Sequence, residues 1–223
     1  MSRAVGSAAV PAKPRSPKGR ARLTQERLIE EYPEARCELD HETPFQLLVA
    51  TILSAQCTDA RVNLVTPALF RRFPSPAELA SAQVDELEEL IRPTGFFRNK
   101  AKSLMGMAQA LIERYDAVVP GPMEDLVTVP GVGRKTANVV RSVALGLPGL
   151  PVDTHVLRLS ARLGLTTETD PVKVEQELNA MIPAGERGAF SLRMILHGRR
   201  VCFARKPNCA GCTLASFCPV AGQ

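Results

Sequence analysis

The 223-residue sequence predicts an all-α fold from its helix starts, its apolar spacing and its scarcity of strand patterns. Thr43 is followed by Pro44 and Gln46, and Ser75 is followed by a proline and Glu78, so both stretches are capping boxes with proline at the first helical position. Apolar residues recur every three or four positions, whereas alternating patterns are nearly absent. With 45% apolar residues, the chain can bury one large core or two smaller ones.

The first segment differs in composition from the rest of the chain. Residues 1–25 contain six basic residues, three prolines and no acidic residue. This stretch is too polar for a signal peptide and too rich in proline to fold alone, so residues 1–22 are expected to form a disordered basic tail. An organellar transit peptide is the alternative interpretation. No run approaches the length of a membrane helix, so no membrane partner is expected.

The helices then follow one another along the chain, each bounded by proline, glycine or a capping residue. Asp170 and Pro171 begin one of them in the same way as the two capping boxes do. No internal repeat of fixed period is present. Helices are expected at residues 24–33, 44–56, 59–71, 76–81, 84–92, 98–115, 123–129, 134–146, 154–163, 171–181 and 186–198.

A glycine hairpin at residues 126–135 is the most informative stretch, with the sequence Leu-Val-Thr-Val-Pro-Gly-Val-Gly-Arg-Lys. Pro130 ends the preceding short helix, while Gly131 and Gly133 permit backbone angles and a close approach that a side chain would forbid. The next helix offers free N–H groups and a positive dipole end, which favour a phosphate, and it places Lys135 in its first turn. An ordinary turn between two helices is the alternative interpretation.

Asp153 is an isolated acid in a basic region. Residues 126–167 contain five basic residues and no other acidic residue. Asp153 precedes a helix that begins after Pro151, and aspartate is a preferred helix cap. Capping is compatible with a chemical role, so Asp153 is also a candidate partner for Lys135.

Four cysteines near the end of the sequence are separated by six, two and five residues, and they form a candidate ligand set: Cys202, Cys209, Cys212 and Cys218. Nothing resembling a secretory signal precedes them, so we expect reduced thiols and not disulfides. Zinc sites with four cysteines commonly pair two C-x2-C motifs, and only one is present, but spacing alone does not exclude zinc. Cys37 and Cys57 are expected to pack as small apolar residues.

Together these motifs resemble the endonuclease III family of helix-hairpin-helix DNA glycosylases. The resemblance rests on residues 126–138, on Val-Asp-Thr-His at 152–155 and on the four cysteines, and it extends over residues 23–220. It implies a two-lobed helix-hairpin-helix fold whose C-terminal loop binds a [4Fe-4S] cluster through the four cysteines. The implied domains are a disordered tail at 1–22, a helical barrel at 37–147, and a second helical domain formed by 23–36 and 148–223.

The resemblance also implies a bifunctional DNA glycosylase and AP lyase of base excision repair. Lys135 would attack the sugar of a damaged pyrimidine nucleotide flipped from the duplex and form an imine, after which β-elimination cuts the strand. Asp153 would stabilise cationic sugar character or help to move the proton. Two alternatives stay open. One is an adenine-mismatch glycosylase, although that family resembles this chain without the lysine and with a further C-terminal domain; the other is a non-catalytic iron–sulfur DNA-binding module.

Further residues are expected to contact DNA. Gln56 matches the glutamine that the family inserts into the duplex, and Phe96 lies where a second inserting residue is carried, although a leucine is expected there and a core aromatic is the alternative. Residues 187–223 contain no acid, so the loop between the first two cysteines is expected to bind phosphate. The expected DNA contacts are Gln56, Phe96, Gly131, Val132, Gly133, Arg134, His155, Arg205 and Lys206.

The expected partner is double-stranded DNA containing damaged pyrimidines or abasic sites. The chain is expected to act as a monomer in the cytoplasm of a bacterium, where the nucleoid lies. Lys135 and Asp153 are expected to face each other across a cleft between the two lobes.

Overall fold

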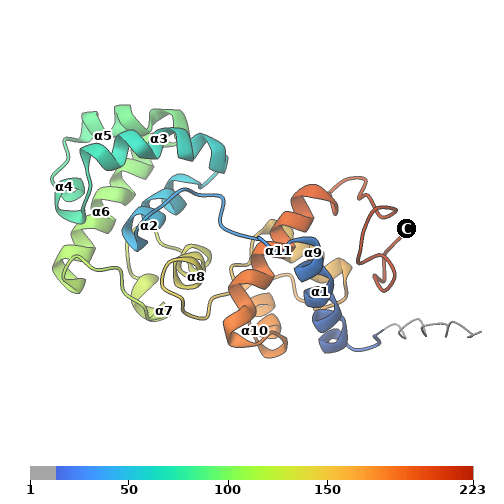
Figure 1. Ribbon diagram of the computed structural model, residues 1–223. Helices are drawn as coiled ribbons and strands as arrows, with labels where there is room; N and C mark the ends of the chain where they lie inside the picture. The colour runs from blue at the N-terminus through green and yellow to red at the C-terminus, as the bar shows by residue number, and fades with distance from the viewer. Residues whose placement is uncertain (1–13, 223) are drawn as a thin grey trace, which may run out of the picture.

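The computed structural model describes residues 14–222, and within this range every regular element is a helix. Figure 1 shows two lobes side by side, with α8 on the side of the first lobe that faces the second. Each lobe has its own cluster of buried apolar side chains. The predicted all-α class is therefore confirmed. None of the helices in residues 14–222 is long and apolar enough to cross a membrane.

The first lobe is built around one buried helix. α2 has eight of its ten residues buried, so it is apolar on nearly all sides and has to be enclosed by other helices. The helices α3, α6 and α8 pack around it. In chain order, this lobe consists of α2 (Pro44–Leu53), α3 (Asp59–Arg72), α4 (Pro76–Ala80), α5 (Val84–Ile91), the 3₁₀ helix η1 (Arg92–Thr94), α6 (Phe97–Tyr115), α7 (Met123–Leu126) and α8 (Arg134–Val143).

The second lobe combines segments from the two ends of the described chain (Figure 1). α1 packs against α10 and α11, while α9 packs against α11, which also contacts α8 of the first lobe. The loop at 201–222 carries the four cysteines and contributes Leu214 and Phe217 to the buried cluster. The helices of this lobe are α1 (Pro17–Glu31), α9 (Thr154–Arg162), α10 (Pro171–Met181), the 3₁₀ helix η2 (Ala184–Glu186) and α11 (Arg187–Arg200).

The predicted helix starts at α2, α4 and α10 are confirmed. Thr43 Oγ1 accepts a hydrogen bond from the N–H of Gln46 at 3.2 Å, and Ser75 Oγ accepts one from the N–H of Ala77 at 3.2 Å. Asp170 caps α10 through its carboxylate. Each cap satisfies a backbone donor that the helix itself leaves unpaired, and replacing such a cap by alanine typically costs about 1 kcal/mol.

The expected disordered tail at residues 1–22 is wrong over its last part, because α1 begins at Pro17. Ser16 caps this helix, with a proline at its first position, which is the same signal as at α2. The guanidinium Nε of Arg20 donates to the carbonyl oxygen of Gly164 at 3.1 Å, which fixes the helix to the second lobe. A contact across 144 residues leaves no local sequence pattern. Residues 1–13 of the expected tail lie outside the described range.

Several helices end earlier than expected, among them α7, which ends at Leu126 and not at residue 129. For two others the backbone gives the reason. α2 ends at Leu53 and not at residue 56, because Gln56 has a φ of 54°, which does not continue a right-handed helix. α8 ends at Val143 and not at residue 146, where Gly146 has a φ of 63°. In α2 the early end leaves a short loop of 54–58 in front of α3.

Candidate active site

The hairpin at 126–135 is anchored in the first lobe and presents Lys135 outward. Val132 is 5% exposed, and its N–H donates to the carbonyl oxygen of Val129 at 3.0 Å. α8 then begins with Gly133 as its N-cap, and Lys135 is exposed in the first turn. The buried valine therefore fixes the base of the hairpin, and the lysine amine extends from a rigid support.

The two glycines of the hairpin have different structural requirements. Gly131 has a φ of 79°, and a Cβ added there would lie 2.8 Å from the Cβ of Ser103. Gly133 has a φ of −85°, and a Cβ added there would meet no atom within 4 Å. The protein itself therefore requires glycine at 131, whereas glycine at 133 keeps the space in front of α8 open. Because α8 also has no side-chain cap, its first N–H groups are directed toward that space.

Asp153 caps α9, as its sequence position predicted. Its Oδ1 accepts hydrogen bonds from the N–H of His155 at 2.8 Å and from the N–H of Val156 at 2.9 Å. Both bonds use the same carboxylate oxygen, so the cap does not occupy Oδ2. Asp153 can therefore hold its helix and present a second oxygen to a ligand.

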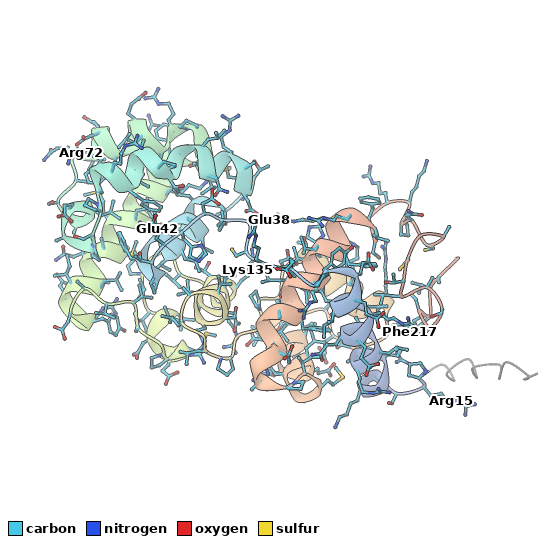
Figure 2. The ribbon with its side chains drawn as sticks, viewed as in Figure 1. Arg15, Glu38, Glu42, Arg72, Lys135 and Phe217 are labelled. Atoms are coloured by element: carbon cyan, nitrogen blue, oxygen red, sulfur yellow. The ribbon has the colours of Figure 1, made fainter. Side chains whose placement is uncertain are left out.

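Lys135 and Asp153 line the same pocket between the two lobes. Figure 2 shows Lys135 on the side of the first lobe that faces the second, close to Glu38 of the linker between α1 and α2. An amine and a carboxylate in one pocket suit attack on an electrophilic carbon with a stabilising negative charge nearby. A larger groove along the linker includes neither residue. Further walls of the pocket are Cys37, Leu39, Thr51, Ser54, Leu192 and Ile195.

Arg134 is held within the protein by an ion pair between the lobes. Its Nε and Nη2 donate to the two carboxylate oxygens of Glu175 on α10, each at 2.8 Å, and Glu175 is 4% exposed. Such a bidentate pair fixes both position and orientation. Nε and Nη2 of Arg134 are therefore occupied within the protein. The pair also joins α8 to α10 directly behind Lys135.

His155 packs between α9 and α11. Its Nδ1 lies 3.1 Å from Nη2 of Arg158, and a Cβ added at Gly198 on α11 would lie 2.8 Å from the same nitrogen. The imidazole thus lies against bare backbone where no side chain fits. Since the backbone N–H of His155 is also one of the two donors to Asp153, its packing orients the capping carboxylate.

The residues expected to reach DNA from loops are exposed. Phe96 is 62% exposed, so its alternative interpretation as a core aromatic is wrong. Gln56, Arg205 and Lys206 are exposed as well. Gln56, Phe96 and Lys206 have φ values of 54°, 49° and 52°, a left-handed conformation that costs free energy in residues other than glycine. Such strained, exposed residues cluster at functional sites.

The four cysteines of the C-terminal loop surround one cavity, and all four are free thiols: Cys202, Cys209, Cys212 and Cys218. Two nitrogens approach their sulfur atoms: Arg162 donates to Cys202 Sγ at 3.2 Å, and His197 Nε2 lies 3.3 Å from Cys212 Sγ. Among residues 14–222, no three cysteine, histidine or acidic side chains converge on one metal ion.

Sequence reasoning did not single out two buried charged residues, Lys100 and Glu175. Lys100 is 5% exposed on the apolar face of α6, one turn before the buried Leu104. Glu175 adjoins the buried Val174 on α10. A charged residue in a position that helical spacing assigns to the core was the available signal, but the sequence does not identify its partner.

A family model described as the HhH-GPD superfamily of base excision DNA repair proteins matches residues 49–184, more than half of the chain. The chain belongs to this superfamily. Endonuclease III of Synechocystis sp. is 58% identical over 191 residues, covering 85% of this chain and 87% of that protein. Endonuclease III of Bacillus subtilis is 46% identical over 188 residues, covering 84% and 86%.

Solved structures agree with the sequence relatives. A non-covalent endonuclease III–DNA complex has a TM-score of 0.86 to this HhH-GPD chain at 43% identity, covering 91% of this chain and 95% of that one. A thermostable thymine-DNA glycosylase has a TM-score of 0.83 at 20% identity, which shows the fold alone. The predicted family and helix-hairpin-helix fold are confirmed. The chain is a DNA glycosylase and AP lyase of base excision repair, as its motifs predicted.

Proposed function

We propose that Lys135 is the nucleophile of this glycosylase and AP lyase, and that Asp153 assists it. The observation that carries the proposal is the shared pocket: the amine of one lobe and the carboxylate of the other line a single cavity. The substrate is double-stranded DNA that contains an oxidised pyrimidine or an abasic site. A relative of 43% identity has been solved as a trapped covalent intermediate with DNA, which supports a covalent step for this chain.

In the proposed reaction the damaged nucleotide leaves the base stack and enters the pocket. The neutral amine of Lys135 attacks the anomeric carbon of the deoxyribose. A bond forms from Nζ to that carbon while the bond to the base breaks, and the base leaves with the electron pair and a proton. The sugar ring then opens: its C1′–O4′ bond breaks, the ring oxygen takes the remaining proton of Nζ, and Lys135 is left joined to the sugar as an imine. Loss of the proton on C2′, next to the imine, then expels the 3′ phosphate and cuts the strand. Asp153 Oδ2 stabilises the positive charge that develops on the sugar.

The same proposal assigns the contacts with DNA. The open N-terminus of α8, with backbone N–H groups from Gly133 onward, binds a phosphate next to the lesion. Gln56 and Phe96 enter the gap that the flipped nucleotide leaves, which their exposure and left-handed backbone support. Arg205 and Lys206 bind phosphates further along the duplex.

We also propose that the four cysteines hold a [4Fe-4S] cluster. Their common cavity, together with the nitrogens of Arg162 and His197 beside two of the sulfur atoms, suits four thiolates around a charged cluster. The cluster would act as architecture, since no step above needs an electron. Cys212→Ser is expected to give colourless or insoluble protein, and metal analysis is expected to find iron. One zinc and no iron would overturn the cluster assignment.

The proposed setting of the enzyme is a bacterial cytoplasm, because the relatives named above from Synechocystis sp. and Bacillus subtilis are bacterial proteins. We propose that it acts as a monomer, since one chain supplies both sides of the pocket. The two buried clusters would be the cores of two domains, one at 37–147 and one formed by 148–223 with α1 and residues up to 36.

Borohydride trapping on duplex DNA with a single abasic site tests the central assignment. Only an imine can be reduced to a stable adduct, so a covalent complex is expected, and peptide mapping should place it on Lys135. A duplex with an adenine mismatch serves as a second substrate. Absence of an adduct, with adenine release from the mismatch, would favour the adenine-mismatch glycosylase instead.

A further inference from the structure

Lys100 is a buried cation without a buried anion beside it. Its side chain is 5% exposed, and among residues 14–222 no carboxylate forms an ion pair with its ammonium group. Burial lowers the pKa of this group. Burying a charge costs several kcal/mol unless hydrogen bonds compensate for the lost water. A leucine or methionine would fill the same position on α6 without that cost, so the hydrogen bonds of the ammonium group have to explain the lysine.

Those hydrogen bonds reach two loops that are far apart in sequence. Nζ of Lys100 donates to the carbonyl oxygen of Leu53 and to that of Thr94, each at 2.8 Å. Leu53 is the last residue of α2, and Thr94 is the last residue of η1. A carbonyl at the C-terminus of a helix carries partial negative charge, which favours a cation there. One ammonium group therefore joins the ends of two helices.

Each of these helix ends leads directly into a residue assigned to the DNA gap. Gln56 lies three positions after Leu53, and Phe96 lies two positions after Thr94. Both residues hold left-handed backbone conformations in short exposed loops. Such conformations persist only where the surrounding structure fixes the chain. The two bonds of Lys100 link these loops to each other through a single ammonium group.

We propose that Lys100 is a positioning residue that sets the separation of Gln56 and Phe96. This inference rests on the proposed insertion of those two residues into DNA. A duplex accepts two inserted side chains only at a fixed spacing along its axis. If the bridge is lost, each loop relaxes independently, and the gap is filled less well when the nucleotide flips out. A misplacement of about 1 Å can reduce a rate about a hundredfold.

The first test compares Lys100→Met with Lys102→Met, an exposed lysine on the same helix. Methionine keeps the volume and apolar length of the side chain but removes the charge and the donors. Lys100→Met is expected to lower kcat/KM about tenfold or more on duplex DNA with an oxidised pyrimidine. Strand cleavage at an abasic site in single-stranded DNA, which has no gap to fill, should fall less than twofold. Lys102→Met should change neither rate. Equal losses on both substrates would overturn the proposal.

Lys100→Gln is a second variant for the case that Lys100→Met does not fold. Its shorter, neutral amide keeps N–H donors, so it should fold and retain part of the preference for duplex DNA. The same ratio of duplex to single-strand activity decides the outcome for this variant. A folded Lys100→Gln protein that loses activity in equal proportion on the duplex and on the single strand would overturn the proposal.

A double-mutant cycle separates positioning from general stability. In a Gln56→Ala, Phe96→Ala background there is nothing left to position, so adding Lys100→Met should cause no further loss of duplex activity. A further loss as large as in the unmodified background would overturn the inference while leaving the assignment of the inserting residues intact. If the Gln56→Ala, Phe96→Ala protein instead kept full duplex activity, the insertion role would fail, and the inference with it.

Discussion

The helices α8 and α9 both begin at the pocket between the lobes, but their N-termini are built in opposite ways. α9 starts with Asp153, whose carboxylate accepts two of its free N–H groups. α8 starts with Gly133, which offers no side chain, and Lys135 follows in its first turn. A cation at a helix N-terminus is unfavourable by about 0.3–1 kcal/mol. By local criteria, therefore, α9 is well capped and α8 is poorly capped.

This difference indicates which group accepts the free N–H donors at the start of each helix. The donors of α9 are satisfied inside the protein, so its N-terminus is complete before substrate arrives. The donors of α8 face open space and are completed only by an external anion. The uncapped N-terminus of α8 thus indicates the DNA-binding surface better than the capped N-terminus of α9 does.

The largest effect is expected from Lys135→Ala. Base release and borohydride trapping should both fall below detection, because the alanine side chain cannot form an imine. DNA affinity should stay largely intact, since the hairpin donors belong to the backbone. Thermal stability should change little, because an exposed surface substitution usually alters it by less than about 0.5 kcal/mol. AP lyase activity near the original rate would contradict the assignment.

Asp153→Asn is expected to lower the rate of base release by about 10²–10⁴-fold, because the amide carries no charge to stabilise the sugar. Its Tm should stay close to the original, since asparagine caps a helix almost as well as aspartate.

The matched control for this change is Asp170→Asn. Asp170 Oδ1 caps α10 through the same pair of bonds, to Val172 N–H and Lys173 N–H, each at 3.0 Å, outside the pocket. The control should keep full activity. A fall in Tm for Asp153→Asn that matches its fall in rate would assign Asp153 a structural role only.

Gly133→Ser would give α8 the kind of cap that α9 has. A serine cap is at least as favourable as glycine, and its Cβ would meet no atom within 4 Å, so Tm should be unchanged or slightly higher. Its hydroxyl would occupy a backbone donor needed for phosphate. DNA affinity should fall about tenfold, which corresponds to roughly 1.4 kcal/mol, in a titration against duplex DNA.

Gly131→Ala is the contrasting variant in the same hairpin. Because residue 131 has a φ of 79° and an added Cβ would meet Ser103, Gly131→Ala should lower Tm, unlike Gly133→Ser. If both glycine variants lost stability equally, the distinction between the two positions would be wrong.

The smallest effect is expected from Lys206→Ala. The absorbance at roughly 400 nm that is expected of the proposed iron–sulfur cluster should stay unchanged in this variant. The slope of log affinity against log salt should decrease in magnitude by about one unit, because one phosphate contact is lost. An unchanged slope would remove the cysteine loop from the DNA-binding surface.

The fold and the pocket residues were predictable where their signals are local. Thr43 and Asp153 are helix caps whose hydrogen-bond partners lie within three residues, so their helix starts can be predicted from the local sequence. The glycine hairpin predicts the start of α8 in the same way. The bidentate pair of Arg134 with Glu175 was not predictable, because its partners lie 41 residues apart and meet only through tertiary packing. The bond from Lys100 to Leu53, across 47 residues, was missed for the same reason.

The order of the lobes along the chain has a consequence for synthesis on the ribosome. The first lobe is one continuous stretch, so it can fold as soon as α8 has emerged, since domains generally fold as units during synthesis. The second lobe needs α1, made first, and α11, made near the end. During synthesis, α1 therefore has no helix to pack against until α10 and α11 have been made. In a nascent chain the segment that carries Lys135 can therefore fold before the second lobe is complete, so the pocket that Lys135 shares with Asp153 forms only when α11 has been made.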